Sequence, residues 1–138
     1  MGPRLTRLAL VPAAVVLGAG ALAAHHSISA IYDSRNQVTV TGSVREFHFV
    51  NPHPWIGLDV GGDEARLQPW RLELDNRFEL VDIGMRADTL KPGDVVVATG
   101  SAGRDGARSM YVLRLDRAAD GLHYEQVGPT PHLKSPAR

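Results

Sequence analysis

The side chains best suited to chemistry in this sequence are its six histidines, two of which, His25 and His26, are adjacent. This adjacent pair comes shortly after Ala21-Leu22-Ala23, a small-residue motif of the kind that signal peptidase cleaves. Cleavage after Ala23 would make Ala24-His25-His26 the new N-terminus, whose nitrogens suit Cu(II) or Ni(II) in a square plane. Cleavage one residue later would put His25 first, and its amine and imidazole would bind copper as a histidine brace. We therefore expect copper here, and the alternative is a solvated histidine pair beside a cleavage site.

A second candidate group surrounds His53, in the segment Asn51-Pro52-His53-Pro54-Trp55. Two prolines restrict this loop and fix the direction of the imidazole, so His53 is the expected third metal ligand. The alternative is that Asn51 and His53 cap backbone groups of the turn while Trp55 packs on its rim. If the chain binds a small ligand or a protein instead of a metal, we expect Asn51 and Trp55 among its contacts.

Other kinds of site are poorly supported. The chain has no cysteine, which excludes thiol chemistry and cysteine metal sites, and it carries no nucleophile elbow, zinc-protease helix or phosphate loop. Glu73 and Asp75 alternate with Arg71, which favours a solvated charged face over paired catalytic carboxylates. Trp55 and Trp70 are possible platforms for a base or a sugar, although the spacing of Trp70 favours the core. No catalytic residue is predicted, and a non-enzymatic protein is expected, with a metal-dependent enzyme as a third alternative.

The start of the chain predicts export. Residues 1–7 contain two arginines and no acid, residues 8–20 are apolar, and the cleavage motif follows, so residues 1–23 are typical of a signal peptide. The rival interpretation is a membrane anchor, but the apolar run is shorter than the ~20 residues that a spanning helix needs. We expect a periplasmic or secreted protein that has no membrane span after cleavage near Ala23 or Ala24.

The charge of the mature chain bears on its partners. Removing residues 1–23 removes two of the 15 basic residues and none of the 15 acidic ones, which leaves a net charge near −2. Nucleic-acid binding usually calls for a basic patch, so no nucleic-acid partner is expected. A metal ion, a small ligand or a protein remains as the expected partner.

Alternation of apolar and polar residues predicts mainly strands. The apolar phase flips between Val44 and Phe47, which indicates a bulge or sharp bend in a long first strand. Further strands are predicted at 55–60, 70–75, 95–99 and 111–115, with a helix near 77–83 capped by Asn76 and Glu79. This order is typical of a five-stranded barrel of the oligonucleotide/oligosaccharide-binding (OB) type, and a small β-sandwich is the alternative. We assign residues 24–127 to this all-β domain and expect residues 128–138 to be a disordered, proline-rich tail.

Several short motifs occur in a characteristic order, and they suggest a family. They are His25-His26-Ser27, Tyr32-Asp33, Thr41-Gly42, Asn51-Pro52-His53-x-Trp55, Trp70-x-x-Glu73 and Leu90-Lys91-Pro92-Gly93-Asp94. Their order and spacing resemble DUF6152, a family of short exported bacterial proteins of unknown function, from His25 to about Asp116. The resemblance implies a signal peptide and a small β-barrel, and it implies no activity. The leading functional expectation is a periplasmic copper-binding barrel, and the alternative is a ligand- or protein-binding module without metal.

Overall fold

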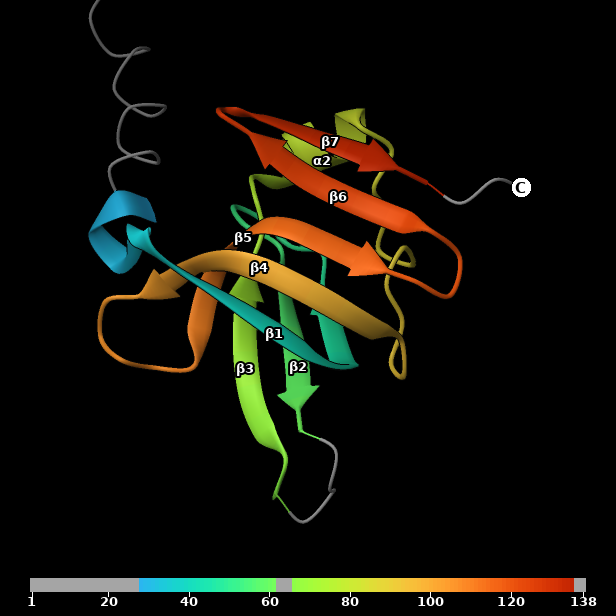
Figure 1. Ribbon diagram of the computed structural model, residues 1–138. Coiled ribbons are helices and arrows are strands. Elements are labelled where there is room, and N and C mark those ends of the chain that lie inside the picture. The colour runs from blue at the N-terminus through green and yellow to red at the C-terminus, as the bar shows by residue number, and fades with distance from the viewer. Residues whose placement is uncertain (1–27, 62–65, 136–138) are drawn as a thin grey trace, which may run out of the picture.

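The computed structural model describes residues 28–61 and 66–135, so the predicted signal peptide, His25 and His26 lie outside the described residues. Residues 28–31 form one helical turn. The elements that follow are β1 (Tyr32–His48), β2 (Trp55–Val60), β3 (Gln68–Glu73), α2 (Arg77–Asp82), β4 (Val95–Gly103), β5 (Ser109–Arg117), β6 (Leu122–Val127) and β7 (Thr130–Lys134) (Figure 1). The predicted all-β class is confirmed. Within the described part of the chain, no helix is long and apolar enough to cross a membrane.

Five of the strands form a closed ring. β1 pairs antiparallel with both β2 and β4, β2 pairs with β3, and β4 pairs with β5. A parallel pairing of β3 with β5, in which Leu72 lies opposite Met110, completes the ring. β6 and β7 extend the sheet from β5 as a hairpin outside the ring, near α2 (Figure 1).

The long first strand bends as its sequence predicts. Its pairing with β2 shifts by one residue between Val44 and Glu46, which leaves Arg45 as the extra residue of a bulge. Gly42 and Ser43 pair with β2 on one side and β4 on the other. The bulge therefore lets one strand serve two sides of the ring and reverses which of its side chains face inward.

The core fills the ring with aliphatic side chains from every strand of it. Fully buried members include Ile56, Leu58, Leu72, Met110 and Val112. Transfer of such side chains out of water is the main stabilising term, at about 1.5–3 kcal/mol for each.

The single helix after β3 begins and packs as its sequence predicts. The Asn76 side chain accepts a hydrogen bond from the Glu79 N–H at 3.0 Å, which satisfies one of the free donors of the first turn. Leu80 then points into the core and is fully buried. The chain leaves the helix through Gly84, whose φ of +94° suits glycine.

The predicted disorder of the tail is wrong for residues 128–135. Thr130–Lys134 form β7 and pair with β6, and Val127 lies opposite Thr130 across the two-residue turn Gly128-Pro129. Gly128 has a φ of +58°, so glycine occupies the first central position as a type II′ hairpin turn requires. Pro131 is tolerated because β7 is an edge strand, and Leu133 packs against the core. Composition predicted a tail, but this turn makes a hairpin.

Candidate functional site

Trp55, the first residue of β2, stands at the centre of a stack of three side chains. His48, its partner at the end of β1, lies parallel to the indole, with ring centroids 4.0 Å apart and planes 9° apart. The Arg71 guanidinium carbon from β3 lies 4.0 Å from the centroid of the indole ring. Since β1 and β3 flank β2 on opposite sides, His48 and Arg71 approach the indole from opposite sides and cover its two faces. Trp55 is therefore held rigidly between β1 and β3.

A groove opens beside this stack on the outer face of β1, β2 and β3, and we call it the Trp55 groove. Its volume is about 400 Å³, and its lining residues are Arg45, Glu46, Trp55, Pro69, Trp70, Arg71 and Arg108. Gly57 shapes one end, because a Cβ there would lie 2.7 Å from Glu46 Cγ and 2.9 Å from Arg45 Nη2. The absence of a side chain at Gly57 lets those two residues lie close over the strand.

The charges on the β1 wall of the groove are largely compensated. Arg45 donates hydrogen bonds to Asp59 at 2.6 Å and to Glu46 at 3.2 Å. Glu46 also accepts a 2.7 Å hydrogen bond from His48 Nε2. These two donors, His48 first, lower the pKa of the Glu46 carboxyl below its ordinary value. Glu46 is thus kept ionised and engaged.

The charges on the opposite wall are different. The Arg71 N–H donates to the carbonyl of Arg108 at 2.9 Å, so the two residues are neighbours in space. Arg108 Nε also donates to Gln68 Oε1 at 3.2 Å. Among the described residues, neither guanidinium forms an ion pair with a carboxylate. The groove consequently presents two cations without a charge partner from this part of the chain.

His53 lies in the β1–β2 loop and not in the lining of the groove. Its Nδ1 lies 3.2 Å from the carbonyl oxygen of Leu74, and since a carbonyl only accepts, Nδ1 carries the proton. Backbone bonds from Leu74 to Pro54 and from Arg77 to Pro52 fix the same loop against the junction of β3 and α2. His53 Nδ1 therefore caps a backbone carbonyl next to β3, and this bond uses one of the two ring nitrogens.

The remaining predicted site residues are placed separately. Asn51 is exposed and precedes a cis peptide bond to Pro52. In the ranges 28–61 and 66–135, no group of three or more histidine, aspartate or glutamate side chains is arranged to hold a metal ion. His25 and His26 lie outside those ranges, so this observation does not test whether they and His53 form a copper site.

The predicted solvated face is wrong at Asp75, and Glu73 is half-buried. Asp75 is only 7% exposed, and it accepts hydrogen bonds from the Asn76 N–H at 2.6 Å and from Gln126 Nε2 at 2.8 Å. Glu73 accepts a 2.7 Å hydrogen bond from the Tyr32 hydroxyl. Both carboxylates are structural, because they tie the end of β3 to β6 and to the start of β1.

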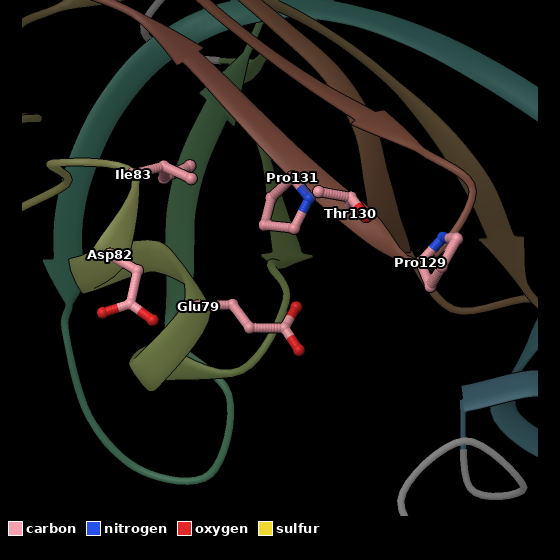
Figure 2. Close-up of a pocket in the computed structure, with 6 residues that line it drawn as sticks. All are labelled: Glu79, Asp82, Ile83, Pro129, Thr130 and Pro131. Atoms are coloured by element: carbon pink, nitrogen blue, oxygen red, sulfur yellow. The ribbon is translucent and has the colours of Figure 1, made fainter.

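A second groove lies between α2 and the β6–β7 hairpin (Figure 2). Figure 2 shows Glu79 and Asp82 projecting from α2 on one side, with Thr130 and Pro131 of β7 on the other. Its volume is about 300 Å³, and it is lined by neither an aromatic nor a basic side chain. It is the seam where the hairpin packs against the helix, and it offers fewer orienting groups than the Trp55 groove.

Residues 13–111 match the family model described as a family of unknown function, DUF6152, and the chain belongs to this family. The resemblance identified from the sequence motifs is thereby confirmed. No curated protein matches the sequence. Among solved structures, the chain is similar to a protein chain in the crystal structure of a TiaS–tRNA–ATP complex. That similarity has a TM-score of 0.46 and 11% identity, and it covers 78% of this chain and 30% of the other.

Proposed function

We propose that this protein is a non-enzymatic binding module built on a small OB-like barrel, and that its ligand occupies the Trp55 groove. The strand ring in the order β1-β2-β3-β5-β4, with a helix between β3 and β4, supports the barrel assignment. Barrels of this type bind ligands on the face of strands 2 and 3, flanked by the loops after strands 1 and 4. Trp55 and Arg71 lie on that face, and Arg108 comes from the loop that follows β4.

The observation that carries this proposal is the immobilised stack of His48, Trp55 and Arg71 beside an open groove. A binding site needs side chains that are held in place before the ligand arrives, because ordering them on binding costs free energy. The groove supplies guanidinium groups and one carboxylate that is already engaged by His48 and Arg45, so it is better suited to holding a ligand than to proton transfer.

Fluorescence of Trp55 tests the proposal. The chain has two tryptophans and both line the groove, so the wild-type protein is titrated beside Trp70→Phe, in which Trp55 is the one tryptophan reporter. Both proteins are titrated with inorganic phosphate, succinate, a neutral disaccharide and a primary amine, and free N-acetyl-tryptophanamide serves as the quenching control. We expect at least one class of ligand to give a saturable change in emission. Changes no larger than those of the control, for every class, would overturn the proposal.

We also propose that the protein is exported and that residues 1–23 are removed, which leaves it in the periplasm or medium. The basic start, short apolar run and Ala21-Leu22-Ala23 support this. The intact mass of the protein recovered from the periplasm should correspond to a start at Ala24 or His25. A membrane-bound protein that still carries Met1 would contradict it.

Copper binding is a second candidate function, and the hydrogen bond of His53 favours it. Because Nδ1 donates to the Leu74 carbonyl, the neutral ring has its lone pair on Nε2, an arrangement that metal-binding histidines commonly show. In this candidate the mature N-terminus supplies His25 or His26 as the anchor, depending on the cleavage site, and His53 completes the site. A metal must displace protons from these groups, so affinity should fall as pH drops through the histidine range near ~6.5.

Copper binding is tested by Cu(II) titration and electron paramagnetic resonance of the signal-cleaved protein and of His25→Ala, His26→Ala and His53→Ala. Loss of binding in His26→Ala alone would support the third-position chelate. Loss in both His25→Ala and His53→Ala would support a brace closed by the loop. Equal, weak binding by all four proteins would overturn the copper function.

A further inference from the structure

We infer that the ligand of the Trp55 groove carries an oxyanion, either a carboxylate or a phosphate, and that Arg71 and Arg108 bind it. This inference rests on the proposed function and adds the chemical class of the ligand. It assigns a binding role to two residues whose types alone mark them as ordinary surface arginines.

The stack decides what Trp55 can contribute. An indole that binds a base or a sugar ring must leave one face open, and both faces of Trp55 are covered, by His48 and by Arg71. The sequence-based idea that Trp55 serves as a stacking platform therefore does not fit this geometry. Its ring instead holds the Arg71 guanidinium in place through a cation–π contact.

The Arg71 guanidinium carbon lies 4.0 Å from the centroid of the indole ring, a distance that suits a stacked arginine. A guanidinium that stacks on an aromatic ring keeps its N–H groups free around its edge, because those bonds lie in the plane of the group. Arg71 and its neighbour Arg108 both line the groove, and their backbones are joined by a 2.9 Å hydrogen bond. The bond from Arg108 Nε to Gln68 uses one of the five N–H groups of that guanidinium and orients the rest. Two planar forks at one groove match the geometry of a carboxylate or phosphate, which accept paired hydrogen bonds.

The charge balance of the lining favours an anion. Three arginines and one carboxylate line the groove, and that carboxylate, Glu46, accepts hydrogen bonds from His48 and Arg45. Arg71 and Arg108 lack an ion-pair partner within 28–61 and 66–135, so an incoming anion would not have to displace one from these segments.

The size of the groove fits a small ligand or the end of a longer one. Its volume of about 400 Å³ lies within the range of small-molecule sites, about 300–1,000 Å³. Removing one charge-assisted donor pair typically weakens binding by about 10- to 100-fold, so each arginine should have an effect that calorimetry resolves.

The test is isothermal titration calorimetry of the full mature chain with inorganic phosphate and, separately, with succinate. Arg71→Gln and Arg108→Gln should each weaken binding of the preferred anion by about 10-fold or more. Arg71→Lys keeps the charge but loses the planar fork, and anion binding by this variant should be weakened nearly as much. Arg114→Gln is the matched control, because Arg114 is ion-paired to Asp116 on β5 outside the groove and should bind like the wild type.

The outcomes separate the inference from the proposed function. Selective loss in the Arg71 and Arg108 variants supports both, and the tighter of the two probes identifies the source of the oxyanion. If the disaccharide or the amine saturates the Trp55 signal while phosphate and succinate do not bind, the inference is overturned and the binding function stands. Anion binding that is unchanged in Arg71→Gln and Arg108→Gln also overturns the inference. If no probe binds, both fail.

Discussion

The buried carboxylate of Asp75 should be one of the most costly side chains to remove. It accepts hydrogen bonds from Gln126 Nε2 at 2.8 Å and from the Asn76 N–H at 2.6 Å, and Gln126 in turn accepts from the Tyr124 hydroxyl at 2.9 Å. Burial raises the pKa of Tyr124, which keeps its hydroxyl protonated as a donor. The network joins the end of β3 to β6, and through it to the C-terminal hairpin.

The cost follows from the number of bonds and their burial. A hydrogen bond to a charged group contributes about 1.5–3 kcal/mol, and Asp75→Ala removes two of them while leaving their donors behind. We expect a loss of about 3–5 kcal/mol in the free energy of unfolding, measured by urea denaturation. Glu125→Ala is the control, because that side chain is 50% exposed on the same strand as Gln126. It should change stability by less than about 0.5 kcal/mol.

A double-mutant cycle separates the pair from its surroundings. Gln126→Ala should cost about 1.5–3 kcal/mol alone, and the double variant with Asp75→Ala should cost at least about 1 kcal/mol less than the sum of the two single changes. Costs that add within about 0.5 kcal/mol would refute the reasoning, as would an Asp75→Ala protein that loses less than about 1 kcal/mol.

Three further outcomes can be measured by denaturation. Val96 is 1% exposed and Val97 is 40% exposed, so Val96→Ala should cost about 2–3 kcal/mol and Val97→Ala about 1 kcal/mol, whereas equal costs would contradict the strand phase. A Cβ at Gly100 would lie 2.2 Å from a β5 carbonyl oxygen, so Gly100→Ala should cost about 3 kcal/mol or more, and a smaller loss would show that the ring can relax there. The Arg114 hydrogen bond lowers the pKa of Asp116, so its stabilisation should be complete above the unfolded-state pKa of about 3.8 and disappear as pH falls through the folded-state value. A stability difference between wild type and Asp116→Asn that persists in acid would contradict this.

Local features of the fold could be predicted from the sequence because local residues determine them. The phase flip between Val44 and Phe47 correctly indicated the bulge at Arg45, since strand side chains alternate strictly and only an extra residue changes the face. Asn76 and Glu79 correctly marked the start of α2, since a cap acts over three residues.

Features that depend on distant strands could not be predicted in this way. The strand predicted at 95–99 is apolar at most positions, and its sequence does not show which face is buried. Val95 and Val97 are exposed because nothing among the described elements covers the outside of β4 there. Asp75 alternates with Leu74 like a surface residue, and its burial depends on Gln126, 51 positions later. The disorder of the tail was predicted from its prolines. That prediction did not consider that Gly128-Pro129 could form a turn that pairs the tail with β6.

Only part of the candidate site could be predicted from the sequence, because the rest depends on the pairing of distant strands. Trp55 could be selected from its residue type and its position after a rigid loop. Arg71 and Arg108 could not, because their proximity depends on the pairing of β3 with β5 and their role depends on the register of β2 with β3. Spacing along the chain carries no information about either pairing.

The most direct test of the binding site is a map of amide chemical shifts in the ¹⁵N-labelled mature protein, titrated with phosphate or succinate. We expect the shifts that saturate to cluster at Trp55, Arg71 and Arg108 and to be absent in the Arg71→Gln protein. Shifts that cluster instead at Glu79, Asp82 and Pro131, or no saturable shifts at all, would contradict a ligand site in the Trp55 groove.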